Sequence, residues 1–280
     1  MSEKLVQMNP EMYTVWNYRR KHVAAVLAGG GDAAVEAAAH ELDVTEAALM
    51  QNPKSYSTWH HRKWVVSQHY CSLEREVVLV ERLLDADARN FHGWGYRRWL
   101  VGIMGVDRRR ELGYSKAKIE ENFSNYSAWH HRSVVLVLDD EGGPRDLTVE
   151  EIDEELTFVR QALYTDPGDQ SGWFYHRWLV GMLMRAKVGG KDEGKHVGPA
   201  TGATAAILRQ ELAVCRDVHS LDSKAKWPVV IARGLVRQLS ALDADEGDGE
   251  LTGWLEDKDA AWLERADPMR AGFYRDEMVI

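Results

Sequence analysis

The sequence predicts an all-α protein, a curved solenoid (a crescent) of stacked helical hairpins that together form an α-α superhelix. Three observations carry this prediction. A motif centred on tryptophan recurs five times, amphipathic segments of helical period lie between its copies, and no stretch alternates convincingly as a strand would. A hairpin with an apolar face is stabilised by stacking on its neighbours, which gives a solenoid. We expect one domain over residues 1–280.

The repeated motif has Asn or Asp seven residues before its tryptophan, in most copies an aromatic residue three before it, and Arg three after it. The Asn or Asp, followed by Pro in three copies, is typical of an N-cap or a turn before a helix. Positions −3, 0 and +3 share one helical face. We expect the +3 arginine to lie along the tryptophan and to cap carbonyls of the adjacent loop. The five central residues are Trp16, Trp59, Trp94, Trp129 and Trp173.

The segments between and after these copies complete the predicted architecture. Residues 73–87, 148–166 and 206–222 carry apolar side chains at helical spacing. A degenerate sixth copy is expected near Trp227, and the last residues supply one or two further helices. Glycine-rich, charged stretches at about 185–202 and 243–253 are predicted to be flexible loops.

Composition narrows the classes of function. The formal net charge of -9 argues against a protein that grips nucleic acid by its phosphates. Only two cysteines occur, Cys71 and Cys215, so a disulfide framework is not expected. The first residues lack the apolar core of a signal peptide, and the longest clearly apolar run, 134–138, is too short to span a bilayer. We therefore expect a cytoplasmic protein with no membrane insertion.

Paired histidines raise the question of a metal site. His60-His61 and His130-His131 are each adjacent in sequence, and adjacent helical residues point about 100° apart, so one pair cannot chelate one ion. We expect these histidines to pack between neighbouring hairpins, and we expect no metal on this chain.

One lysine breaks the repeat. Lys54 stands five residues before Trp59, where the other copies hold Glu, Arg, Ser or Gly. A lone lysine is usually a solvated surface residue. The alternative is a point positive charge directed at a phosphate or a leaving group. The residues alone leave both interpretations open.

The five copies resemble the repeats of the protein prenyltransferase α-subunit family. The stretches "NPKSYSTWHHRKW", "NFHGWGYRRW", "NFSNYSAWHHRS" and "DQSGWFYHRWLVG" are similar above all to its Rab geranylgeranyltransferase (type II) branch, and "DPMRAGFYRDEM" near the end is similar as well. The resemblance runs from Asn9 to Glu277.

This resemblance implies an obligate heterodimer, in which the helical crescent wraps around a β subunit. The β subunit would carry the only zinc and the isoprenoid pocket, and this chain would be inactive without it. The heterodimer would transfer geranylgeranyl from geranylgeranyl diphosphate to C-terminal cysteines of Rab GTPases presented by a Rab escort protein. Some members of the family carry an immunoglobulin-like insert and a leucine-rich repeat domain, and neither is expected here.

The resemblance also assigns residues. It implies that Lys54 faces the diphosphate across the subunit boundary as a catalytic residue, with Tyr56 beside it. Arg62, Asn90 and Trp94 match positions near the same junction. Two alternatives stay open: the α subunit shared by farnesyltransferase and geranylgeranyltransferase type I, and a non-enzymatic helical-repeat scaffold. The 34-residue tetratricopeptide period differs from the uneven spacing found here.

Overall fold

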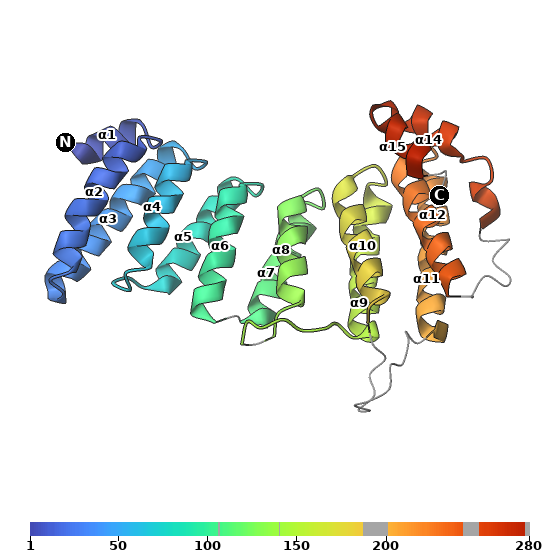
Figure 1. Ribbon diagram of the computed structural model, residues 1–280, viewed down its shortest axis with the longest axis horizontal. Coiled ribbons are helices and arrows are strands. Elements are labelled where there is room, and N and C mark those ends of the chain that lie inside the picture. Colours follow the sequence, from blue (N-terminus) through green and yellow to red (C-terminus); the bar gives the residue numbers. More distant parts are fainter. Residues whose placement is uncertain (106, 140, 187–200, 243–251, 278–280) are drawn as a thin grey trace. The chain divides into compact units, whose positions relative to one another are not determined.

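The computed structural model describes residues 1–105, 107–139, 141–186, 201–242 and 252–277. Across these residues the chain is helical apart from short connections, and they contain no β-strand (Figure 1). The predicted helical-repeat fold is therefore confirmed. Most of the two predicted flexible loops, 187–200 and 243–251, lies outside the described residues. The elements are α1 (Ser2–Met8), α2 (Tyr13–Leu27), α3 (Gly31–Gln51), α4 (Tyr56–Val66), α5 (Leu73–Ala86), α6 (Phe91–Met104), α7 (Arg108–Glu121), α8 (Tyr126–Leu136), α9 (Val149–Thr165), α10 (Gln170–Leu183), α11 (Thr201–Leu221), α12 (Lys226–Ala241), η1 (Gly253–Leu255), α14 (Ala260–Ala266), η2 (Pro268–Arg270) and α15 (Ala271–Glu277).

The helices alternate between two kinds. We call α2, α4, α6, α8, α10 and α12 the A helices, and α3, α5, α7, α9 and α11, which follow them in turn, the B helices. The chain forms two compact units: the first holds residues 1–118 and 138–143, and the second holds residues 119–137 and 144–280. In the first unit α3 packs against α2 and α4, and in the second α9 packs against α10 and α11 against α12. Each unit is thus a stack of hairpins.

The turn before each A helix, which we call a tip, has a fixed construction. Asn52 ends α3, and its side-chain Oδ1 accepts a hydrogen bond from the backbone N–H of Lys54 at 3.1 Å. Ser55 then caps α4 by accepting from the N–H of Thr58 at 3.2 Å. The Asn or Asp at −7 therefore makes the turn, and the residue at −4 occupies the N-cap position.

The central tryptophans fasten the tips to the helices. The indole Nε1–H of Trp59 donates to the carbonyl of Pro53 at 2.8 Å, and that of Trp94 donates to Ala88 at 2.9 Å. The other three make the same bond to the carbonyl six residues earlier. All five rings are buried. Burial with a satisfied N–H is what a large amphipathic ring requires in a core.

The +3 arginines have a different main partner from the one expected. Arg62 donates to the carbonyl of Leu42, but its principal contact is a bidentate ion pair with Glu76 on the following B helix, with both N–O distances 2.7 Å. Arg19 with Glu41, Arg97 with Glu111 and Arg132 with Glu155 repeat this pairing. The expectation of carbonyl capping missed these glutamates, because a glutamate on an amphipathic helix ordinarily faces solvent.

Three of these glutamates, Glu41, Glu76 and Glu155, also join one hairpin to the next. The hydroxyl of Tyr96, on α6, donates to Glu76 at 2.5 Å. Nε2 of His61, on α4, lies 2.7 Å from Oε1 of Glu41. His61 is almost completely buried, so its predicted packing role between hairpins is confirmed. His60 and His130 are exposed, so the same expectation was wrong for these two histidines.

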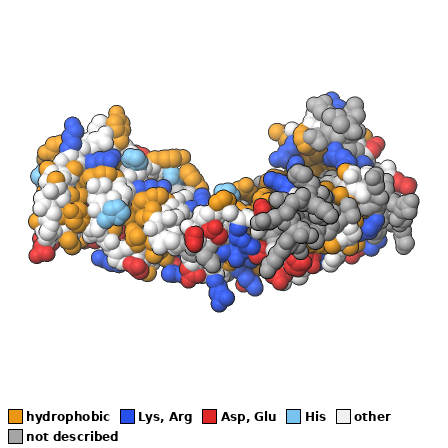
Figure 2. Space-filling view, turned by 60° about the horizontal axis from the view of Figure 1, so that its bottom comes forward, with side chains coloured by type: hydrophobic (Ala, Val, Ile, Leu, Met, Phe, Trp, Pro, Cys, Tyr) orange, Lys and Arg blue, Asp and Glu red, His pale blue; other side chains and the backbone are white. Residues whose placement is uncertain are grey.

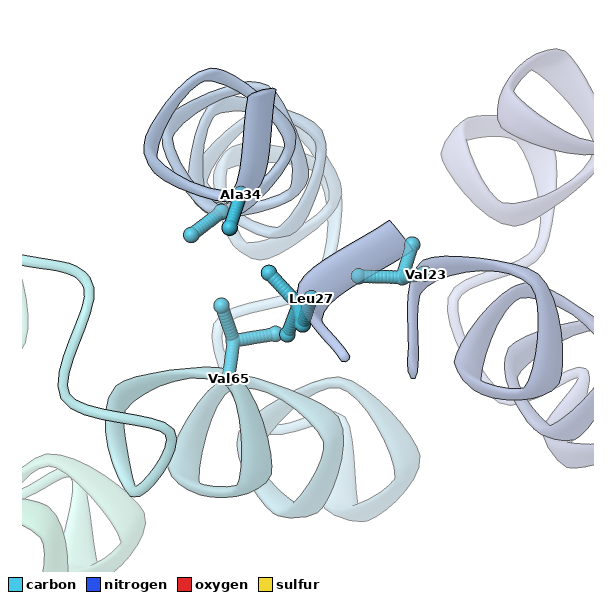
Figure 3. Close-up of a cluster of buried hydrophobic side chains, with 5 residues drawn as sticks. Val23, Leu27, Ala34 and Val65 are labelled. Atoms are coloured by element: carbon cyan, nitrogen blue, oxygen red, sulfur yellow. The ribbon is translucent and has the colours of Figure 1, made fainter. Parts of the chain in front are cut away.

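Small residues allow the first hairpins to approach closely. Leu27 of α2 points between Ala34 of α3 and Val65 of α4, and Val23 lies on the same side of α2 (Figure 3). These four side chains are buried. Burying a side chain such as Leu27 stabilises the stack by about 1.5–3 kcal/mol.

The sixth copy is present but shifted from the predicted register. Asp222 Oδ1 accepts from the N–H of Lys224 at 3.0 Å, as in the other tips, and α12 begins at Lys226. Counting from this turn, buried Val229 takes the place of the central tryptophan, two residues after Trp227.

Charge is divided between the two kinds of helix. In the first unit α2, α4 and α6 contain no Asp or Glu, whereas α3 and α5 each contain four or more. Over the N-terminal helices in Figure 2, basic and histidine side chains lie among hydrophobic ones, and the visible acidic side chains lie mainly along the lower edge. No helix in the described part of the chain has the length and apolarity needed to cross a membrane.

Candidate functional site

Two neighbouring tips of the first unit bring a lysine and an aspartate together. Lys54 lies in the tip before α4, and its Nζ is 3.1 Å from Oδ2 of Asp87 in the tip before α6. The hydrogen bond from Lys54 lowers the pKa of Asp87, which keeps that carboxylate ionised. The Lys54 side chain is 63% exposed. An exposed pair of this kind is weak, so a stronger anion can displace Asp87 from the ammonium group.

Two aromatic side chains lie beside this lysine. Tyr56 is 66% exposed, and its ring meets that of His92 edge to face, with centroids 4.2 Å apart. Burial lowers the pKa of His92, and the positive charges of Lys54 and Lys63 lower it further against the opposing effect of Glu11. His92 is therefore a neutral imidazole at pH 7. Its Nε2 is buried and has no hydrogen-bond partner among the described residues.

His92 was not predicted as a site residue, although the sequence contains a signal for it. It stands two residues before Trp94, where the other four copies hold Thr14, Ser57, Ser127 and Ser171. It therefore breaks the repeat as Lys54 does, and on the adjacent tip.

Asn90 ties the two tips together. Its side-chain Nδ2 donates to the carbonyl of Pro53 at 2.9 Å, and its Oδ1 caps α6 by accepting from the N–H of His92 at 3.0 Å. The residue is almost completely buried. Asn90 thus fixes the backbone next to Lys54 relative to the start of α6.

The other two predicted site residues lie deeper. Trp94 is fully buried, and Arg62 is 3% exposed. Burial opposes the charge of Arg62, but the hydrogen bonds and charge of Glu76 outweigh it and raise the pKa of Arg62. The structure therefore exposes Lys54 and Tyr56 at the surface of the tips, and it places Asn90, Arg62 and Trp94 in the framework beneath.

The tips offer hydrogen-bond donors for an anion. An exposed ammonium, that of Lys54, and an exposed phenol, that of Tyr56, lie on one tip, and cationic donors bind phosphate-type oxygens strongly. Burial raises the pKa of both thiols, Cys71 and Cys215, so neither is a ready nucleophile. Among the described residues, no three His, Cys, Asp or Glu side chains are grouped so as to hold a metal ion.

The helical repeat matches known proteins. The family model described as "Protein prenyltransferase alpha subunit repeat" matches residues 38–69, 73–104, 108–138 and 152–183. Each match begins in a B helix and ends at or just after the following A helix. A solved structure, Candida albicans protein geranylgeranyltransferase-I complexed with GGPP, has a TM-score of 0.68 at 21% identity, covering 99% of this chain and 82% of that one. This likeness shows the fold.

Two relatives are similar in sequence. The chain is 52% identical over 191 residues to geranylgeranyl transferase type-2 subunit alpha 1 of Arabidopsis thaliana. This alignment covers 67% of this chain and 28% of that protein. It is 34% identical over 248 residues to geranylgeranyl transferase type-2 subunit alpha of Dictyostelium discoideum, covering 88% of this chain and 75% of that protein. The chain thus spans less than a third of the plant relative and three quarters of the other.

Proposed function

Because this chain belongs to the protein prenyltransferase α-subunit family, together with type-2 geranylgeranyl transferase α subunits, we propose that it is the α subunit of a geranylgeranyl transferase that modifies Rab GTPases. It acts with a β subunit, which carries the zinc and the isoprenoid pocket, and a Rab escort protein presents the substrate. We place this reaction in the cytoplasm. The two cysteines are free thiols, which is compatible with a reducing compartment. The observation that carries the proposal is the exposed Lys54 held at paired tips.

The chemistry gives Lys54 a role. A cysteine thiolate of the substrate attacks C1 of geranylgeranyl diphosphate, a C–S bond forms, and the C–O bond breaks with its electron pair going to diphosphate. Zinc on the β subunit would keep the thiol ionised. Negative charge grows on the departing oxygen, and an ammonium group beside that oxygen stabilises the transition state more than the ground state. Lys54 supplies this charge, and the exposed hydroxyl of Tyr56 is a neighbouring donor.

Three buried residues support the same site from within. Asn90 holds the tip of Lys54 against α6. Trp94 anchors the next tip through the carbonyl of Ala88, and Arg62 locks α4 to Glu76. We assign these three positioning roles at the subunit junction, because their side chains are buried within the chain.

Co-expression with a type-2 β subunit tests the proposal. We expect the two chains to co-purify and to transfer geranylgeranyl to a Rab GTPase in the presence of escort protein, and we expect neither subunit to do so alone. Pairing with a farnesyltransferase β subunit instead would identify the shared α subunit. Transfer activity of this chain by itself would overturn the proposal, and failure to pair with any prenyltransferase β subunit would favour a scaffold.

A further inference from the structure

A row of cations runs across the A helices of the first unit, away from the tips. Arg20, Lys63 and Arg98 occupy the same repeat position, four residues after the central tryptophan, on α2, α4 and α6. Between them lie Trp64 and Trp99. The guanidinium carbon of Arg20 is 4.8 Å from the ring centroid of Trp64, and Nζ of Lys63 is 5.5 Å from that of Trp99. We call these five residues the basic stripe.

The cations of the basic stripe lack oxygen partners within the described chain. All three are half-buried, yet none forms an ion pair or a side-chain hydrogen bond with a described residue. Nη1 of Arg98 is buried without a hydrogen-bond partner in the described part of the chain. Burial lowers the pKa of Lys63 and of Arg98, and no carboxylate acts in the opposite direction. A buried cationic nitrogen normally has an acceptor, so the row is incomplete at Arg98 as it stands.

The second unit shows what completes such a position. Counted from its tip, Arg233 on α12 stands at the same +4 position. There the chain itself covers the helix, and Arg233 donates from Nε to the carbonyl of Lys258 at 3.0 Å and from Nη2 to that of Leu255 at 3.2 Å. Where a segment packs over the +4 row, it supplies oxygen acceptors.

We propose that the basic stripe is the docking surface for an acidic segment of a protein partner, whose carboxylates pair with Arg20, Lys63 and Arg98. The A helices of this unit have no Asp or Glu with which the partner's acids would clash. Packed helices lie about 8–10 Å apart, and an extended chain advances about 3.3 Å per residue, so acids at every third residue match the row. Apolar residues between the acids would contact the tryptophans.

A single-stranded nucleic acid is the competing occupant, because basic and aromatic side chains also alternate in such sites. Base stacking needs free ring faces, and here a cation lies over each of Trp64 and Trp99. The net charge of -9 also opposes a polyanion of high charge density. These two observations favour the peptide.

The test measures the fluorescence anisotropy of a labelled 15-residue peptide, five repeats of Glu-Leu-Ser, titrated with the full chain at low salt. The test variant combines Arg20→Gln, Lys63→Gln and Arg98→Gln. The control variant combines Lys4→Gln, Arg75→Gln and Arg109→Gln, which removes the same charge from exposed positions off the stripe. Thermal melting verifies folding, and Lys63→Arg, which keeps the charge, should keep the affinity.

We expect saturable binding that the test variant weakens by about tenfold or more and the control variant by about twofold or less. A peptide of the same composition with its glutamates clustered should bind more weakly. The proposal is overturned if the peptide does not bind, if both variants weaken binding equally, or if a 15-residue oligothymidine binds more tightly than the peptide. These outcomes do not depend on prenyl transfer, so they are separable from the proposed function.

Discussion

Replacing Glu76 with alanine should destabilise the first unit severely. Glu76 is 2% exposed, accepts two hydrogen bonds from Arg62 at 2.7 Å each, and accepts a third from the Tyr96 hydroxyl at 2.5 Å. Its removal leaves a buried guanidinium without a counter-charge, at a cost of about 3–5 kcal/mol. The orphaned hydroxyl of Tyr96 adds a cost of about 1–3 kcal/mol, but penalties within one network do not simply add. We expect a loss of about 4 kcal/mol.

Urea denaturation followed by circular dichroism measures this loss, with Glu46→Ala as the matched control. Glu46 also lies on a B helix and pairs with an arginine, Arg82, but the arginine side chain of that pair is 59% exposed. The control should therefore cost under about 1 kcal/mol. Combining Glu76→Leu with Arg62→Met removes both charges and should recover most of the loss. A Glu76→Ala variant within about 1 kcal/mol of the parent chain would refute the reasoning.

Three further predictions concern the same framework. Trp94→Ala empties a fully buried site and should cost about 3–5 kcal/mol by urea denaturation, whereas a loss below about 1 kcal/mol would show that the ring is not part of the core. Asn90→Ala should lower the free energy of unfolding by about 0.5–2 kcal/mol in the same measurement. Asn90→Ser should lower it less, because a serine can still cap α6. Equal losses for the two variants would contradict the capping role. Burial raises the pKa of Glu41, but hydrogen bonds from His61 and Arg19 outweigh burial and hold that pKa below its ordinary value of 4.5. A carboxyl whose pKa is lowered in the folded state adds stability above pH 4.5, and this stability is lost as the pH falls through the folded-state pKa. Replacing Glu41 with Gln should therefore make the free energy of unfolding fall less steeply below pH 4.5. An unchanged fall in this acid range would argue against the assignment.

The repeat made most of the fold predictable. The tryptophan spacing located α2, α4, α6, α8 and α10, and helical period located α5, α9 and α11, because both signals arise from burial that every hairpin needs. The glutamate partners of the +3 arginines were not predictable, since their distance from the arginine varies: Glu76 and Glu111 follow by 14 residues, Glu41 by 22 and Glu155 by 23. Pairing across helices depends on how hairpins stack, which a local pattern does not encode.

The candidate site was predictable only where it breaks the repeat. Lys54 departs from the other copies at its position, whereas His92 departs in the same way but was missed. Asn90 is an N-cap that also bonds to the carbonyl of Pro53 in the neighbouring tip. Its second role follows from the contact between tips 37 residues apart in sequence, so the motif alone could not reveal it.

The single-turnover rate of geranylgeranyl transfer by a heterodimer carrying Lys54→Ala tests the central claim most directly. The matched control is Arg89→Ala, because Arg89 is exposed and occupies the same position, five residues before the tryptophan, on the adjacent tip. Lys54→Ala should leave assembly and melting temperature nearly unchanged and slow transfer by about 10- to 100-fold, while Arg89→Ala stays near the parent rate. A Lys54→Ala heterodimer that transfers at the parent rate would contradict the account and return Lys54 to an ordinary surface lysine.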